Sequence, residues 1–222
     1  MARLTRVESQ NLTRQKIKEA ALREISSSGY IAASVDRIAA AAGFSKGAFY
    51  ANYPSKQDLM LELMREIGRQ ENATRRLLIE ASDDIEAIYR GLVVGFDAFL
   101  KKADWGLFMA EIQLQAKRDK VFGAAYRRYQ NEARKCSDEF FEAFFAKAKK
   151  KLPVPVATAT SMLHNLVTGI YLNAESNKAA NISENAAEMM LIFLKGLIAM
   201  AEPLPLRAAK NSKTKQIQPI TG

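Results

Sequence analysis

The sequence predicts an all-α protein, and three observations lead to that fold class. Apolar side chains recur at intervals of three and four residues from about residue 13 to residue 202, which is the spacing of one helix face. No segment of convincing length alternates between apolar and polar residues, as a half-buried strand would. Proline and glycine number only six and eleven in 222 residues, which disfavours a turn-rich β fold.

Capping residues delimit the helices of the N-terminal part. Thr13 is the expected N-cap of the first helix, which we expect to end at Gly29. Ser34, Ser45 and Ser55 are the expected N-caps of the next three, because a hydroxyl there accepts a hydrogen bond from a free backbone N–H group. The predicted helices cover 13–28, 34–42, 45–50 and 55–78.

The rest of the chain carries longer apolar stripes at helical spacing. Two prolines, Pro153 and Pro155, end the longest of these segments. The last two helices are strongly apolar and need burial on more than one side. The predicted helices cover 83–102, 104–117, 119–150, 156–175 and 184–202.

The formal net charge is +9, and its excess lies at the two ends of the chain. Residues 1–60 and residues 203–222 each carry a net charge of +4, whereas residues 61–202 carry +1. A basic end on a nearly neutral body is typical of a protein that binds nucleic acid, although a solvated surface that maintains solubility gives the same pattern. We divide the chain into a flexible basic arm, a three-helix domain, a larger helical domain and a disordered basic tail, with bounds 1–12, 13–60, 61–202 and 203–222.

The segment 34–53 has the spacing of a helix-turn-helix motif. Ala39 is small where the first helix must approach the second, and Gly43 stands in the turn, where positive φ favours glycine. Phe49 follows on the side of the second helix that faces the first. A small residue, a glycine and a large apolar residue at this spacing predict a DNA-reading helix pair, although ordinary helical hairpins produce the same pattern.

The second helix of this motif carries side chains suited to DNA. Ser45 offers a hydroxyl to a phosphate at the helix start, and Lys46 can donate to phosphate or guanine. Small residues at 47 and 48 would let the helix enter the major groove, and Tyr50 can reach a phosphate. Asn52 can pair with adenine, and Lys56 at the next helix start would contact the DNA backbone. The alternative for each is a solvated helix face.

The stretch from Thr13 to Leu59 resembles the DNA-binding domain of the TetR family of bacterial transcriptional regulators. Departures are Ser34 where the family more often has Thr, Phe44 where Val is usual, and Ala51-Asn52 in place of a common aromatic or histidine pair. The residues that carry the resemblance are Ala20-Ala21, Gly29-Tyr30, Ser34-Val35, Ile38-Ala39, Ala42-Gly43, Ser45-Lys46-Gly47, Phe49-Tyr50, Tyr53, Ser55-Lys56 and Leu59.

The resemblance implies a dimeric regulator that binds a palindromic operator on double-stranded DNA and releases it when a small-molecule effector binds. It implies dimerisation through the last two helices, 156–175 and 184–202. The apolar pattern of the last helix points the same way, because an apolar stripe there would otherwise leave a large exposed patch: Met189, Ile192, Phe193, Gly196, Leu197 and Met200. The positions that the resemblance assigns to DNA contact are Ser34, Arg37, Ser45, Lys46, Gly47, Ala48, Tyr50, Asn52 and Lys56.

The effector would lie among the helices of the larger domain. For the apolar candidates the alternative is ordinary core; for Glu111 it is the solvent-exposed surface, and for His164 a packed or interface histidine. The candidate lining residues are Phe96, Trp105, Phe108, Met109, Glu111, Ile112, Tyr126 and His164.

Other function classes find little support in the sequence. A single cysteine, Cys136, and a single histidine disfavour a metal site, and no catalytic motif is recognisable, so we expect no cofactor and no catalytic residue. No apolar run is long enough to span a bilayer and no signal peptide is evident, so we expect a cytoplasmic protein. Two alternatives stay open: a helical enzyme that uses carboxylates, with a merely solvated basic surface, and a DNA-binding activator that responds to no ligand.

Overall fold

The computed structural model describes residues 5–100, 105–174 and 182–204. Within these ranges the chain is helical apart from its connections and one isolated antiparallel pairing of Lys150 with Pro203, which confirms the predicted all-α class. The helices are α1 (Arg6–Ala32), α2 (Val35–Ala41), α3 (Lys46–Tyr50), α4 (Lys56–Ala81), α5 (Ile85–Leu100), α6 (Trp105–Arg118), α7 (Lys120–Lys147), α8 (Val156–Ala174) and α9 (Ile182–Met200).

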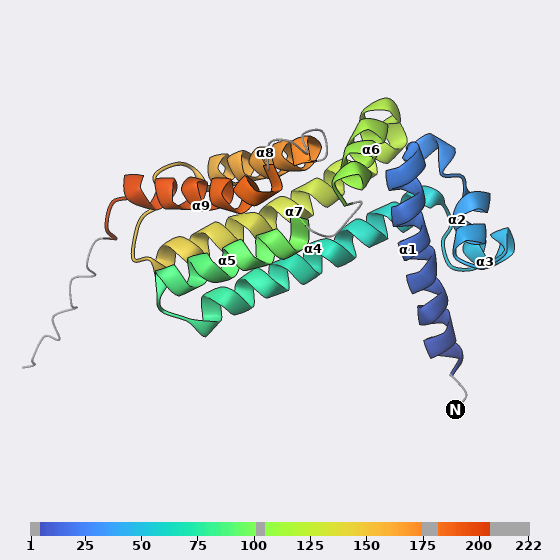
Figure 1. The fold of residues 1–222 in the computed structure, drawn as a ribbon, viewed down its shortest axis with the longest axis horizontal. Helices are drawn as coiled ribbons and strands as arrows, with labels where there is room; N and C mark the ends of the chain where they lie inside the picture. Colours follow the sequence, from blue (N-terminus) through green and yellow to red (C-terminus); the bar gives the residue numbers. More distant parts are fainter. Residues whose placement is uncertain (1–4, 101–104, 175–181, 205–222) are drawn as a thin grey trace, which may run out of the picture.

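The molecule is elongated, with the small helices at one end (Figure 1). α4, α5, α7, α8 and α9 lie side by side along the long axis, and α1 stands across the end of this bundle with α2 and α3 beside it. α6 lies where α1 meets the bundle. This arrangement leaves α2 and α3 at the tip of the molecule, far from the last helix.

The first helix begins earlier than the sequence predicts. Its N-cap is Thr5, whose hydroxyl accepts from the Glu8 backbone N–H while the Glu8 side chain accepts from the Thr5 backbone N–H. Thr13 lies inside the helix and donates its hydroxyl to the Ser9 carbonyl at 2.9 Å. The predicted flexible arm over 1–12 is therefore wrong for residues 6–12, and residues 1–4 lie outside the described ranges.

Gly29 interrupts α1, where the sequence predicts its end. Its backbone has φ 82° and ψ 161°, a conformation open essentially to glycine alone. The interruption frees the next backbone N–H, that of Tyr30, which donates to a Glu111 carboxylate oxygen at 2.8 Å. The break thus ties the end of α1 to α6.

The apolar side chains form two buried clusters along the long axis. The first unites α1–α3 and the start of α4 with α6 and the start of α7, around fully buried residues such as Phe49, Met64 and Phe108. The second joins α5, α8 and α9 to the far parts of α4 and α7. The predicted boundary at residues 60–61 falls inside α4, because this continuous helix packs into both clusters.

The chain after α9 begins ordered. Leu204 donates its backbone N–H to the Lys149 carbonyl at 2.9 Å, and Lys151 donates to the Glu202 carbonyl at 2.8 Å. The predicted tail over 203–222 therefore starts with two residues anchored to the end of α7, and residues 205–222 lie outside the described ranges.

Candidate nucleic-acid interface and ligand cavity

α2 and α3 form the predicted helix-turn-helix frame. Ser34 and Ser45 cap them by accepting from the backbone N–H groups three residues later, at 3.2 and 3.1 Å. Between the helices Gly43 has φ 79°, and Ala39 is 1% exposed. Phe49 is fully buried in the first cluster. The small residue, the glycine and the aromatic ring therefore occupy the positions that their spacing predicts.

The outer side of this frame presents polar and aromatic groups to solvent. Tyr50 is half exposed, although the neighbouring Phe49 is completely buried. Ser34 and Ala48 are partly exposed. The exposed members of the predicted DNA-contact set are Arg37, Ser45, Lys46, Gly47 and Tyr50.

Two exposed cations on this face already have acidic partners. Lys46 donates to Asp36 at 2.9 Å, and this hydrogen bond raises the pKa of Lys46. A guanidinium nitrogen of Arg37 lies 2.9 Å from a Glu24 carboxylate oxygen. The Lys46–Asp36 pair is exposed on both sides and contributes at most about 1 kcal/mol, so a phosphate can replace Asp36. The Glu24 oxygen that meets Arg37 is buried, so Arg37 is held more firmly than Lys46.

Asn52 does not join the exposed face. Its side-chain nitrogen donates to the Ala48 carbonyl at 2.8 Å, and its side-chain oxygen is buried with no hydrogen-bond partner in the described structure. The amide folds back onto the end of α3, so the adenine contact of Asn52 stays a prediction that would require the side chain to turn outward.

Lys56 also turns away from solvent. Its ammonium donates to the carbonyls of Tyr30 and Ala33 at 2.5 and 3.0 Å, and lies 4.0 Å from the centre of the Tyr30 ring. Burial lowers its pKa. In this structure the ammonium satisfies the last carbonyls of α1, where a helix favours a cation, so the phosphate contact of Lys56 stays a prediction that would require the ammonium to leave them.

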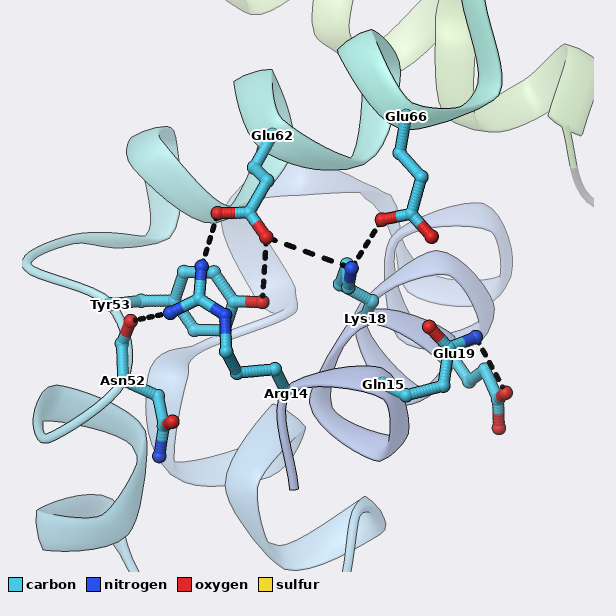
Figure 2. A network of polar contacts seen from close by, with 8 residues as sticks. All are labelled: Arg14, Gln15, Lys18, Glu19, Asn52, Tyr53, Glu62 and Glu66. Atoms are coloured by element: carbon cyan, nitrogen blue, oxygen red, sulfur yellow. Dashed lines mark hydrogen bonds and ion pairs between the residues drawn. The ribbon is translucent and has the colours of Figure 1, made fainter. Parts of the chain in front are cut away.

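A polar network fastens this frame to α1 and α4 (Figure 2). Arg14 of α1 bonds the Asn52 carbonyl at the end of α3, pairs with Glu62 of α4, and stacks 4.3 Å above the centre of the Tyr53 ring. Lys18, whose side chain is only 10% exposed, pairs with both Glu62 and Glu66. The carboxylates of α4 therefore hold α1 and the end of α3 in one arrangement.

The two lysines should respond differently to substitution. We expect Lys46→Gln to reduce the salt slope of DNA binding by about 1 per subunit, because each lost phosphate contact removes about 0.9 from that slope. Lys56→Gln should leave the slope unchanged and reduce the free energy of unfolding by about 1–3 kcal/mol, since two carbonyls lose a charged donor. The measurements are affinity titrations at several salt concentrations and urea unfolding. An equal loss of slope in both variants would support the phosphate role of Lys56.

A cavity of about 280 Å³ that is partly open to solvent lies between the two apolar clusters and is lined by α4–α9. Five of the predicted effector residues line it, and no bound molecule tests their role: Phe96, Trp105, Met109, Tyr126 and His164. Three others do not line it. Phe108 and Ile112 are fully buried in the first cluster, on the side of α6 that faces α1, and Glu111 bonds the Tyr30 backbone.

The polar groups of this cavity are not among the residues that the sequence predicts to line it. Arg75 from α4 and Arg134 and Ser137 from α7 line it beside His164 of α8. Burial, followed by the charges of Arg134 and Arg75, lowers the pKa of His164, whose Nε2 lies 3.0 Å from the Ser137 hydroxyl. A signal existed in α7, where a polar triplet at 130, 134 and 137 continues the helical spacing of Tyr126.

The described part of the chain offers neither a metal site nor a membrane-spanning helix. Within 5–100, 105–174 and 182–204, no three of the His, Cys, Asp and Glu side chains are grouped so as to hold a metal ion. In the same ranges no helix has the length and apolar character required to cross a membrane. Cys136 is a partly exposed free thiol.

Known proteins resemble both the frame and the whole chain. Residues 17–63 match the model of bacterial regulatory proteins of the tetR family. The HTH-type transcriptional repressor AcnR of Corynebacterium glutamicum is 25% identical over 186 residues, which cover 84% of this chain and 92% of AcnR. A putative TetR-family regulator from Mesorhizobium loti shares the fold, with TM-score 0.66, 19% identity and coverage of 89% of this chain and 99% of its own.

A further solved structure, the regulator FadR from Bacillus subtilis in complex with stearoyl-CoA, has TM-score 0.68 at 14% identity, with coverage of 82% of this chain and 98% of FadR. The matched residues 17–63 contain the whole helix-turn-helix frame, including its exposed recognition helix. The curated relative extends the similarity to the larger helical domain. Residues 17–63 are accordingly a DNA-binding domain of the tetR family type, and the chain is a DNA-binding regulator that is similar to members of that family along most of its length.

Proposed function

We propose that the protein is a homodimeric transcriptional repressor that binds a palindromic operator and is released by a small-molecule effector. The observation that carries the proposal is the exposed outer face of α3, with Lys46, Gly47 and Tyr50 held over the buried Phe49. Such a helix at the tip of the molecule can enter a major groove without moving the rest of the fold. The curated relative AcnR is a repressor, which supports the direction of regulation.

Dimerisation is supported by apolar side chains that the single chain leaves exposed. Met189, Ile192 and Met200 of α9 are 39–68% exposed, and Met162 of α8 is 47% exposed. Their spacing along α9 makes one stripe, in which Gly196 allows close approach of a partner helix. Leu197, which the sequence assigns to this stripe, is 5% exposed and belongs to the second cluster. A second copy would cover the stripe and place two recognition helices on one face of a palindrome.

Release by an effector is supported by two helices, α4 and α6, that line the cavity and also contact the DNA-binding end of the molecule. The first half of α4 carries Glu62 and Glu66 of the polar network, and its second half lines the cavity. α6 lines the cavity through Trp105 and Met109 and bonds the end of α1 through Glu111. An effector that binds better when α4 and α6 are shifted would therefore favour another orientation of the helix-turn-helix.

Glu111 provides a direct test of the contact between α6 and α1. We expect Glu111→Ala to accelerate hydrogen exchange of the Tyr30 amide and to reduce the free energy of unfolding by about 1.5–3 kcal/mol, because this N–H donates to a charged acceptor. Glu111→Gln keeps an acceptor oxygen and should have a smaller effect on both measurements. Unchanged exchange at Tyr30 in Glu111→Ala would show that the contact does not hold the end of α1.

The experiment that tests the proposed function is selection of bound duplexes from a random DNA pool by the full chain. We expect enrichment of an inverted repeat whose half-sites are about one helical turn apart, or a multiple of one turn. Enrichment of a single half-site would contradict the dimeric arrangement. Binding without enrichment that disappears at moderate salt would contradict sequence-specific regulation and leave only polyanion binding by the basic ends.

A further inference from the structure

The cavity has a polar end formed by three helices. Arg75 projects from α4, Arg134 and Ser137 from α7, and His164 from α8, and all four line the same space. Both arginine charges act on the His164 imidazole, and Ser137 lies within hydrogen-bond distance of it. Two cations and two neutral hydrogen-bonding groups are therefore gathered at one end of an otherwise largely apolar cavity.

The acidic groups around this end leave Arg134 available. Asp138, one turn further along α7, instead accepts a hydrogen bond from Thr160 at 2.5 Å. Arg134 donates to the neutral hydroxyl of Ser161 at 2.8 Å, and no described carboxylate lies within ion-pair distance of it. Glu71 is the carboxylate among the described lining residues, and its backbone carbonyl accepts from Arg75. The described lining thus holds two cations against one acid.

The opposite end of the cavity is aromatic and lies toward the helix-turn-helix formed by α2 and α3. Phe99 of α5 lies 6.2 Å from Trp105 of α6, between ring centres, and Trp105 stacks on the buried Phe108. Met109 and Tyr126 complete this end. An apolar body placed here would touch α6, the helix that contacts α1.

We propose that the cavity binds a small organic anion, with its carboxylate at Arg134 and Arg75 and its apolar body against Phe99 and Trp105. This inference rests on the proposed function, because it names the chemical class of the effector. Arg75 is partly buried, and Arg134 is exposed although it lines the cavity. A bidentate guanidinium–carboxylate pair is stronger than the corresponding contact with a neutral head group. With roughly 30 Å³ for each water-sized group, 280 Å³ holds about nine or ten non-hydrogen atoms.

The test uses eight-carbon probes with different head groups. Trp105 is the only tryptophan of the chain and lines the cavity, so its fluorescence reports binding in the absence of DNA. We expect octanoate to bind the full chain at least tenfold more tightly than octanamide, its neutral counterpart, and octylamine to bind more weakly still. Equal affinity for octanoate and octanamide, or stronger binding of octylamine, would overturn the inference.

Matched variants locate the head group. Arg134→Gln should reduce the affinity for octanoate to that for octanamide, whereas Arg128→Gln, an exposed position of α7 outside the cavity, should leave it unchanged. Arg75→Gln and its exposed neighbour Arg76→Gln form a second pair with the same expectation. An equal effect of Arg134→Gln and Arg128→Gln would overturn the assignment. A chain that selects an inverted repeat but binds no octanoate would keep the proposed function and refute the anionic effector.

Discussion

Phe49→Ala is expected to reduce the free energy of unfolding by about 3–5 kcal/mol and to abolish DNA binding. The ring is fully buried between α2 and α3, and its centre lies 5.9 Å from the centre of the Tyr53 ring. Its removal therefore leaves a cavity at the centre of the helix-turn-helix. A loss of this size is a large fraction of the stability of an ordinary domain. Thermal and urea unfolding measure the first effect, and titration with a selected duplex measures the second.

Tyr50→Ala is the matched control, because this aromatic residue is the immediate neighbour but is 50% exposed. Its ring contributes one edge contact with Phe49, at 5.5 Å between ring centres, so we expect less than about 1.5 kcal/mol of destabilisation. The affinity for DNA should fall about 10- to 100-fold through loss of a direct contact. If Tyr50→Ala retained full affinity in a folded protein, the assignment of the outer face of α3 to DNA would be wrong.

Glu62→Gln is expected to weaken DNA binding from a distance. Its carboxylate receives Arg14 and Lys18 and lies 3.4 Å from the Tyr53 hydroxyl, so the substitution removes the charge on which three donors converge. Hydrogen bonds to charged groups contribute about 1.5–3 kcal/mol, and the partial exposure of Glu62 favours the lower part of this range. Arg14 would then hold the Asn52 carbonyl, and with it the end of α3, less firmly.

Glu66→Gln is the control one turn along the same helix. Glu66 pairs with Lys18 alone in this network, and Lys18 keeps Glu62 at 3.6 Å when that pair is lost. We expect less than about 1 kcal/mol of destabilisation and unchanged DNA affinity. Unfolding curves and duplex titrations of the two variants decide the matter: an equal effect on DNA affinity would contradict the special role of Glu62 in orienting α3.

The first residues of α2, α3 and α4 could be predicted because each helix start is marked by a capping residue next to it in the sequence. Ser34, Ser45 and Ser55 each cap a helix through a backbone N–H group three residues away. The start of α1 was missed although Thr5 and Glu8 form a capping box, because residues 6–12 lack the apolar periodicity that marks a buried helix face. The capping residues, and not packing against the core, therefore stabilise that first turn.

The roles of long polar side chains could not be predicted, because distant elements determine them. Lys56 and Asn52 match positions of a DNA-contacting motif, yet the end of α1 takes the ammonium and α3 itself takes the amide. Arg75 and Arg134 are 59 positions apart, and only the packing of α4 beside α7 places both in one cavity wall. Neither arrangement has a signature within a single helix.

Sequence-specific binding by a dimer is tested most directly by comparing the affinity of the full chain for a selected inverted repeat with its affinity for the same duplex in scrambled order, at physiological salt. We expect the repeat to bind at least about 10³-fold more tightly, with two subunits per duplex. Equal affinities for the two duplexes would contradict sequence-specific binding, because the exposed face of α3 would then bind phosphates without reading bases.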